Sequence, residues 1–521
     1  MNRRHFIDRL SRLAAILALA SFHRAPAAQA SPARLPAGDD PFVLGVASGV
    51  VRPDSVVLWT RLVRRPYEPG GGMPDFPIAV RWELAADERF AQPLRSGEAI
   101  AWPDRAHSVH VEVDGLPPAT AFHYRFRAGA HASATGRTRT APAADADVAT
   151  LRMALASCQH YEQGAFAVHR EIAERELDFV VFVGDYIYEG SSTRRLVRAH
   201  EAGTATTLDG YRARHATYKL DRDLRAAHAA HPWLVTWDDH EVENDYADDH
   251  SPSGCSSEAF LRRRAAAYQA YFEHMPLALA SRPNGPAMTI HDRFVWGRLA
   301  ELWTLDDRQY RSAQACSDAP RAGGRVIGAW CGEVGEPSRT VFGAAQEAWL
   351  ARGLADSQRS WRLVAQGTQI SGTGIDTPAG RQFYSDGWEG YPQARERLLR
   401  AAAQARLGGV VCLGGDVHRH VAARLRVRAN DERSPIVASE IVASSITSRG
   451  TSEPLMASMR SSNPDIVHGR GDERGYALIT VGREATQCDF RATAHPVFDG
   501  AVLHSQARVV IERARPGVHL A

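Results

Sequence analysis

The sequence predicts an α/β protein in which a two-sheet αββα sandwich follows a small β-sandwich. Short alternating strands, separated by Pro and Gly, run from residue 40 to about residue 140. From about residue 150, buried strand patterns alternate with helical patterns, and parallel and antiparallel pieces are mixed. A length of 521 residues also exceeds what one small core requires. We therefore place two domains at 40–140 and 150–521.

The first domain is predicted from half-buried strand patterns. They are Val56–Leu62, Ile78–Leu84, Val109–Val113 and Phe122–Arg127. Leu116–Arg125 resembles the turn and strand of fibronectin type III domains, in which a tyrosine packs near a corner. We expect a small domain of that kind that contributes binding surface or spacing, and a linker at Ala141–Ala149.

The second domain is predicted to alternate strands with helices. The predicted strands are Arg152–Ser157, Phe179–Val183, Trp233–Trp237, Leu299–Leu305, Trp361–Gln366, Gly409–Leu413, Ser439–Ala443, Tyr476–Val481 and Cys488–Thr493. The predicted helices are Phe166–Arg175, Tyr211–Ala230, Glu258–His274, Ala344–Asp356 and Tyr391–Arg406. This mixture favours two packed sheets over a simple doubly wound sheet.

The charge balance argues against a nucleic-acid surface. The formal net charge is +2, and Lys219 is the only lysine, so nearly every cationic side chain is an arginine. Acidic residues are interspersed among these arginines almost everywhere. We therefore expect no nucleic-acid footprint.

Residues 1–30 have the pattern of a twin-arginine export signal. Arg3 and Arg4 precede the apolar stretch Leu13–Phe22, and Ala28-Gln29-Ala30 is a small-x-small cleavage site. The apolar stretch is too short for a good membrane span. The sequence therefore predicts a periplasmic or secreted protein without a transmembrane anchor, and a monomer whose partner during export is the twin-arginine machinery.

Most of the six cysteines have structural interpretations. Cys316 and Cys331 lie in a Gly-rich, Pro-containing loop and form the predicted disulfide, because an exported protein meets an oxidising compartment. Cys412 and Cys488 lie in strand patterns and are expected to be small buried hydrophobes. Cys255 has no assigned partner.

Five predicted strands end in polar segments. These are Leu155–His160, Gly184–Glu189, Trp237–Asp245, Leu305–Arg311 and Leu413–His420. Loops that leave the carboxyl ends of strands converge over an α/β sheet, so these segments could together hold two metals. In the second segment, a carboxylate and a phenolate three residues apart offer hard oxygen ligands for a trivalent metal.

Four motifs, in this order along the chain, resemble those of the calcineurin-like metallophosphoesterases. They are Ser-Cys-Gln at 157–159, Gly-Asp-Tyr-Ile-Tyr at 184–188, Asp-Asp-His-Glu at 238–241 and Gly-Asp-Val-His at 415–418. Within that group the sequence is similar to the alkaline phosphatase D (PhoD) family over nearly the whole mature chain. The resemblance implies a metallophosphoesterase sandwich with Fe3+ and Ca2+ as cofactors. It also implies hydrolysis of phosphate mono- and diesters by attack of a metal-bound hydroxide or oxide.

The resemblance further implies an iron site. Asp185 would bridge the metals, and Cys158, Tyr188 and His418 would bind iron as thiolate, phenolate and imidazole. Asp416 would lie on the side of the other metal. Alternative interpretations remain: Asp185 could cap the following helix, Tyr188 could belong to the core, and Cys158 could be a buried hydrophobe.

The remaining implied roles concern calcium and the leaving group. Asp239 stands where related phosphatases have an asparagine, and a carboxylate there favours calcium. Asn244 is a further expected calcium ligand, with a simple turn residue as the alternative. His240 is expected near the leaving-group oxygen, as a general acid or a transition-state hydrogen-bond donor.

Two further segments carry expectations. Asp306 and Arg308 are expected to form an ion pair beside the metal ligands. Asp386–Tyr391 is a Gly-rich aromatic segment that the family also shows. We interpret it as a lid hinged by its glycines, with Trp388 as a packing surface for the substrate, although a folded surface loop is the alternative.

The motifs leave other functions open. A phospholipase D that acts on phospholipid diesters would use the same core residues and differ in access to the pocket. A non-catalytic secreted binding protein built on the β-sandwich is an alternative of another class. The presence of every expected ligand position argues against that alternative.

Overall fold

The computed structural model describes residues 32–192, 197–317, 323–405 and 409–521. The predicted export signal at residues 1–30 therefore lies outside the described residues. Across the described part of the chain, no helix combines the length and the apolar character needed to cross a membrane.

The larger sheet has ten strands. In spatial order they are β25 (Arg515–Leu520), β24 (His504–Glu512), β23 (Ala485–Ala494), β22 (Glu473–Gly482), β9 (Thr150–Ala156), β10 (Phe179–Val183), β11 (Pro232–Thr236), β1 (Val46–Gly49), β2 (Val56–Arg61) and β5 (Ser108–Val113). Strands β9, β10 and β11 pair in parallel. Every residue of β10 is buried, as its unbroken apolar run predicts.

The second sheet has seven strands. In spatial order they are β12 (Asp292–Trp296), β13 (Ala300–Thr304), β15 (Trp361–Ala365), β18 (Val410–Gly414), β20 (Ile436–Val442), β19 (His420–Arg426) and β21 (Ile466–Arg470). Strands β13, β15, β18 and β20 pair in parallel. A separate small sheet contains β14 (Val326–Gly328), β17 (Gly380–Tyr384) and β16 (Ile375–Thr377).

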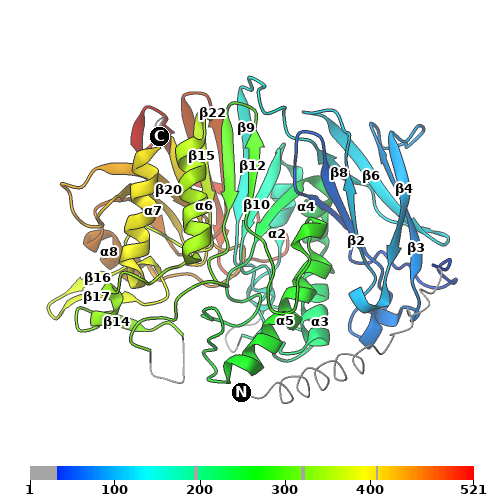
Figure 1. The fold of residues 1–521 in the computed structure, drawn as a ribbon, viewed down its shortest axis with the longest axis horizontal. Coiled ribbons are helices and arrows are strands. Elements are labelled where there is room, and N and C mark those ends of the chain that lie inside the picture. The colour runs from blue at the N-terminus through cyan, green and yellow to red at the C-terminus, as the bar shows by residue number, and fades with distance from the viewer. Residues whose placement is uncertain (1–31, 193–196, 318–322, 406–408) are drawn as a thin grey trace, which may run out of the picture.

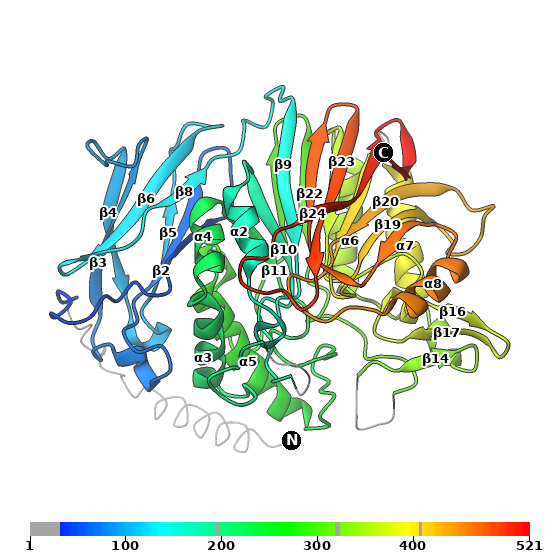
Figure 2. The same cartoon turned by 180° about the vertical axis from the view of Figure 1, so that it is seen from behind.

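Helices cover the outer faces of both large sheets. They are α2 (Ala167–Glu174), α3 (Leu208–Lys219), α4 (Arg222–Ala230), α5 (Ser257–His274), α6 (Gly343–Asp356), α7 (Pro392–Gln404) and, near the small sheet, α8 (Glu453–Ser462). Figures 1 and 2 show α2 to α5 outside the larger sheet and α6 and α7 outside the other. One apolar core lies under each helical layer and a third lies between the sheets. The predicted αββα order is confirmed.

The N-terminal region, blue in Figure 1, contains a further sheet with β4 (Arg95–Ala101), β3 (Ile78–Ala85), β6 (Ala121–Ala128), β7 (His131–Ala132) and β8 (Gly136–Arg139). This sheet shares an apolar core with β1, β2 and β5, as a β-sandwich does. Strand β1 also pairs in parallel with β11. One sheet of the N-terminal β-sandwich is therefore continuous with the larger sheet of the second domain.

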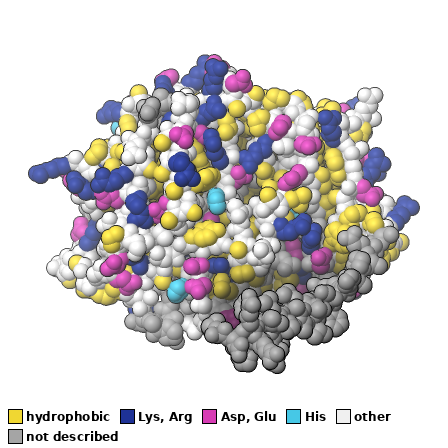
Figure 3. Space-filling view, viewed as in Figure 1, with side chains coloured by type: hydrophobic (Ala, Val, Ile, Leu, Met, Phe, Trp, Pro, Cys, Tyr) yellow, Lys and Arg dark blue, Asp and Glu magenta, His cyan; other side chains and the backbone are white. Residues whose placement is uncertain are grey.

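The prediction of one helix over Tyr211–Ala230 is wrong, because the chain forms α3 and α4 instead. Asp221 separates them, and its carboxylate accepts hydrogen bonds from the backbone N–H groups of Asp223 and Leu224. Such an N-cap starts a new helix, and the sequence-based prediction did not recognise Asp221 as one. On the face drawn in Figure 3, basic and acidic side chains are interspersed.

Candidate metal centre and active site

Both sheets direct their functional residues to one place. Cys158 follows β9, Asp185 follows β10 and Asp239 follows β11, while Asp416 follows β18 of the other sheet. Strands β9, β10 and β11 run parallel to one another, and β18 runs parallel to β15 and β20, so their carboxyl ends lie at one edge of each sheet. An isolated bridge between Ser157 and Ser445 links the two edges beside the site.

The backbone at the site is strained. Cys158, Asp185, Asp416 and His418 all have positive φ angles, of 58°, 55°, 61° and 52°. Such left-handed conformations cost about 1–3 kcal/mol each for residues other than glycine. The surrounding sheets hold these turns in place, and strain of this kind is concentrated at functional sites.

One group of ligand atoms combines a thiol, a carboxylate and an imidazole. Those of Cys158, Asp185 and His418 all lie within 4.8 Å of one another. The Tyr188 hydroxyl lies 2.8 Å from Asp185 Oδ2 and 3.1 Å from His418 Nε2. Because His418 Nδ1 bonds the Arg449 carbonyl at 2.8 Å, Nε2 is the nitrogen that faces the group. The structure thus brings together the four residues predicted to bind iron.

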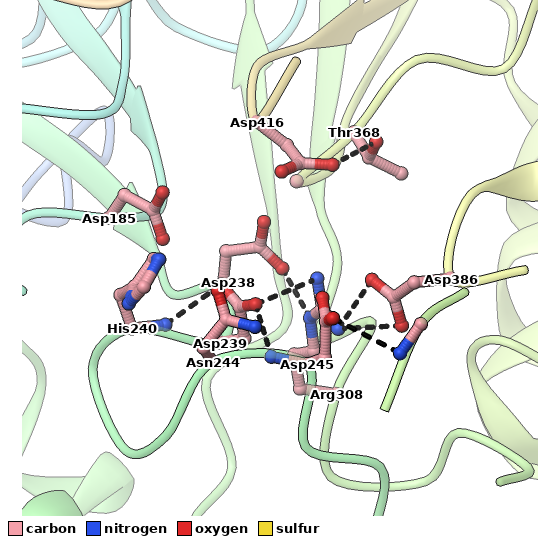
Figure 4. Close-up of polar contacts among 12 residues, drawn as sticks. Asp185, Asp238, Asp239, His240, Asn244, Asp245, Arg308, Thr368, Asp386 and Asp416 are labelled. Atoms are coloured by element: carbon pink, nitrogen blue, oxygen red, sulfur yellow. Dashed lines mark hydrogen bonds and ion pairs between the residues drawn. The ribbon is translucent and has the colours of Figure 1, made fainter. Parts of the chain in front are cut away.

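A second group contains Asp185, Asp239 and His240, again within 4.8 Å. Asp185 belongs to both groups, as a bridging ligand must. His240 Nδ1 lies 2.7 Å from Glu189 Oε2, and its ring packs on Tyr188 with centroids 4.1 Å apart. Figure 4 shows His240 directed toward Asp185. The arrangement leaves His240 Nε2 available to a ligand in the site.

The third group is Asp239, Asp245 and Asp386, and two of its members contact the buried Arg308. Arg308 is ion-paired with Asp238, lies 2.9 Å from Asp386 Oδ2 and 3.7 Å from Asp239 Oδ2 (Figure 4). Despite the desolvation that burial causes, these carboxylates raise the pKa of Arg308 well above its usual value. Arg308 thus compensates part of the charge of Asp239 and Asp386, whereas burial and these neighbouring carboxylates raise the pKa of Asp245 to about 7.

In the first group, burial outweighs the attraction between Asp185 and the neighbouring His240. Burial, with smaller contributions from nearby carboxylates, raises the pKa values of Asp185, Cys158 and Tyr188 well above their usual values. Asp185 Oδ1 is buried and has no hydrogen-bond partner within the described structure. Without a cation these groups favour their protonated forms, whereas a multivalent cation would allow them to ionise together. The donor set therefore fits a metal ion.

Asp416 and Asn244 lie at the border of the site. Asp416 is outside the three groups, and its Oδ2 accepts a hydrogen bond of 2.6 Å from the Thr368 hydroxyl (Figure 4). The side chain of Asn244 is exposed, and its backbone N–H donates to Glu189 Oε1. A cavity of about 530 Å³ begins at Asp416.

Comparison with known proteins identifies the group to which the chain belongs. The model of the PhoD-like phosphatases matches residues 153–490, and the model of the N-terminal domain of PhoD-like phosphatases matches residues 27–142. The chain belongs to the PhoD-like phosphatase family. It is 41% identical over 486 residues to alkaline phosphatase D of Bacillus subtilis (strain 168), which covers 92% of this chain and 82% of that relative.

A solved structure described as PhoD superposes with a TM-score of 0.88 at 42% identity and covers 93% of each chain. The sequence-based prediction of a PhoD-type phosphoesterase, with its fold and its hydrolase class, is therefore confirmed. Metal dependence is consistent with the ligand groups described above.

Trp388 is not a substrate surface in this PhoD-like phosphatase. Its side chain is 2% exposed, its Nε1 donates to Gln366 Oε1, and it packs against Phe342 in the core beneath α6 and α7. The glycines beside it in the sequence suggest a hinge, but the large apolar indole is held in the interior. The neighbouring Asp386 and Gly387 do line the cavity.

The expected ion pair between Asp306 and Arg308 is also wrong. Asp306 accepts hydrogen bonds from Trp237 Nε1 and Gln309, while the Arg308 guanidinium turns to Asp238 and Asp386.

The free cysteines are Cys158, Cys255, Cys412 and Cys488, whereas Cys316 and Cys331 are joined in a disulfide.

Sequence reasoning missed the residues that support the candidate ligands. Glu189 holds His240, Thr368 holds Asp416, and Ser448 donates to the Tyr188 hydroxyl at 2.7 Å. Glu189 belongs to a polar segment at a strand end, so its position gave a signal. Thr368 and Ser448 follow β15 and β20, whose ends carry small polar residues without a motif.

Proposed function

We propose that this chain hydrolyses phosphate mono- and diesters at alkaline pH with iron(III) and calcium bound in this centre. The proximity of a thiol, a carboxylate and an imidazole within 4.8 Å, beside a phenol, supports this proposal. Cys158, Asp185, Tyr188 and His418 would hold the iron. Thiolate, phenolate and carboxylate are anionic ligands, which together suit a trivalent ion.

Calcium would bind the oxygen ligands on the other side of Asp185. Asp239 shares a group with Asp185, which supports a bridging role for Asp185. Asp416 keeps Oδ1 available because Thr368 engages Oδ2. Asn244 has an exposed amide whose oxygen can join this set. Carboxylate and amide oxygens are the ligands that calcium prefers.

The side chains have separate tasks in the proposed reaction. Bound metals would supply Lewis-acid activation of water and would offset charge on the phosphoryl oxygens. His240 Nε2 donates a proton to the leaving-group oxygen, while Glu189 fixes the ring through Nδ1. The cavity beside Asp416 leaves room for the ester substituent.

The substitution Asp185→Asn tests the site. We expect hydrolysis of 4-nitrophenyl phosphate and of bis(4-nitrophenyl) phosphate to fall at least about 1,000-fold, because the bridging charge is lost. Circular dichroism should be unchanged. Asp209→Asn, on the exposed face of α3, is the matched control and should keep wild-type turnover. Wild-type turnover in Asp185→Asn would exclude this centre.

Elemental analysis of natively exported protein tests the metals. We expect close to one iron per chain together with calcium. Zinc or manganese without iron would retain a phosphoesterase but would remove Cys158 from its proposed role. Absence of any bound metal, with activity unaffected by chelators, would refute the metal centre.

Phospholipase D activity is the second candidate, and one observation favours it. Val326 and Leu455 line the cavity with 64% and 43% of their surfaces exposed, so apolar side chains stand at its opening. Exposed apolar side chains at the opening of a cavity suit a lipid diester as the substrate. Release of choline from phosphatidylcholine, compared with hydrolysis of a soluble diester at equal concentration, separates the two activities.

We also propose that residues 1–30 direct export through the twin-arginine machinery, and that the mature protein acts as a periplasmic or secreted monomer. Arg3→Lys together with Arg4→Lys should retain the precursor in the cytoplasm. Processed protein outside the cytoplasm from that double variant would contradict the export route. Sedimentation of the mature chain tests the monomer.

A further inference from the structure

The cavity that begins at Asp416 has a polar part and an apolar part. It lies between the hairpin of β16 and β17 and helix α8. Arg419, Gln369 and Thr451 contribute polar groups to its wall. Ile375, Phe383 and Met459 contribute apolar surface. At about 530 Å³, it can hold an organic substituent in addition to a phosphoryl group.

Arg419 is a buried arginine in the wall of this cavity. Its residue surface is 5% exposed, and its Nε and Nη1 donate to Gln369 Oε1 at 3.0 Å and to Thr451 Oγ1 at 3.3 Å. Within the described residues, its side-chain hydrogen bonds go to these two neutral groups, and no ion pair joins it to a carboxylate. Arg308, by contrast, has several carboxylate partners.

A buried guanidinium that lacks a counter-ion is costly, and an anionic ligand is its natural partner. The carboxylates that also line the cavity do not fill this role. Asp386 is paired with Arg308, Asp245 accepts a hydrogen bond from Tyr384, and Asp416 is bonded to Thr368. The neutral partners Gln369 and Thr451 orient Arg419 without neutralising it.

We propose that Arg419 binds a second anionic group, carried by the alcohol substituent of a phosphodiester substrate, while the carbon chain of that substituent packs on Phe383, Ile375 and Met459. The inference rests on the proposed function, since the reacting phosphoryl group must occupy the metal centre beside Asp416. The preferred substrates are therefore diesters whose substituent bears a carboxylate or a further phosphate.

Two matched synthetic diesters test this preference. One is the 4-nitrophenyl 3-carboxypropyl phosphate diester, and the other carries a carboxamide in place of the carboxylate. The readout is the ratio of their kcat/KM values. A charged hydrogen bond predicts a ratio of about ten or more in the wild type. Arg419→Gln should reduce that ratio to about one, and Arg419→Lys should retain part of it.

Controls separate the possible outcomes. Thr451→Val, which removes one contact that orients Arg419, should lower the ratio partly and serves if Arg419→Gln fails to fold. Arg262→Gln, on the exposed surface of α5, should leave the ratio unchanged. A wild-type ratio near one, or an equal fall for both esters in Arg419→Gln, would overturn the proposal. Failure of the wild type to hydrolyse either ester would instead refute the proposed function.

Discussion

The pairing of Glu189 with His240 gives a sharp prediction about pH. His240 Nδ1 lies 2.7 Å from Glu189 Oε2, and Glu189 is buried. Burial opposes a charged His240, but the carboxylates of Glu189, Asp185 and Asp239 outweigh it and raise the pKa of His240 well above its usual value. Bound metals would neutralise Asp185 and Asp239, which leaves Glu189 as the carboxylate that keeps His240 protonated.

Glu189→Gln removes the charge and keeps the shape. The amide oxygen of Gln can still accept the backbone N–H of Asn244. A hydrogen bond between charged groups contributes about 1.5–3 kcal/mol, which corresponds to about one to two pKa units. If His240 acts as the acid, kcat/KM falls as pH rises through its pKa. The alkaline limb of the profile should therefore move about one to two pH units lower in Glu189→Gln.

The assay is a pH profile of kcat/KM on bis(4-nitrophenyl) phosphate, with metal content measured for each variant. The control is Glu473→Gln, which removes a carboxylate 3.2 Å from the exposed His504 and should leave the profile unchanged. An unshifted alkaline limb in Glu189→Gln with wild-type metal content would refute the acid role of His240. A fall at all pH values that accompanies the shift would add a positioning role for Glu189, which holds the His240 ring through Nδ1.

Three other substitutions probe the backbone, a buried cation and the iron site. Gly184→Ala should lower the free energy of unfolding in urea by about 3 kcal/mol or more, because φ at Gly184 is +102° and the new Cβ would lie 2.4 Å from Asp238 Cβ. Gly190→Ala is the control, because a Cβ at Gly190 meets no atom within 4 Å. Burial lowers the pKa of Lys219 to about 7, so the unfolded chain binds a proton that the folded chain releases. Wild-type stability should therefore gain about 2 kcal/mol between pH 7 and pH 9, and a gain of equal size in Lys219→Met would contradict this assignment. Cys158→Ser should lose iron while it retains calcium by elemental analysis, and unchanged iron content would remove the thiol from the site.

The sequence predicts the carboxyl ends of the strands well, for a physical reason. A central strand such as Phe179–Val183 is buried on both faces, so its apolar run stops where the polar loop begins. The end of each run marks the residue that reaches the site edge. Asp185 could therefore be identified as a candidate ligand before the arrangement of the strands was known, whereas the ligand role of Cys158 is implied by the resemblance to the family's motifs.

Pairings between distant segments are much harder to predict. Arg308 could pair with the adjacent Asp306, yet it contacts Asp386, which lies 78 positions away and reaches it through a different loop. Trp388 illustrates the same limit, since glycines beside an aromatic residue suggest a mobile lid and do not reveal that the indole is in the core. Local composition indicates how freely the backbone of a segment can move, whereas the burial of a side chain depends on how the whole sandwich packs around it.

The strained turns explain why the site needs two packed sheets. Four candidate ligands have left-handed backbones, which together cost about 4–12 kcal/mol, comparable with the total stability of a domain. This cost must therefore be offset by the structure that surrounds the turns. The apolar core between the sheets holds β9 and β10 against β18. The Ser157–Ser445 bridge joins the two edges where Cys158 begins its turn. Substitutions that weaken packing in the apolar core between the sheets should therefore let these turns relax, so that the candidate ligands move apart before the helices unfold.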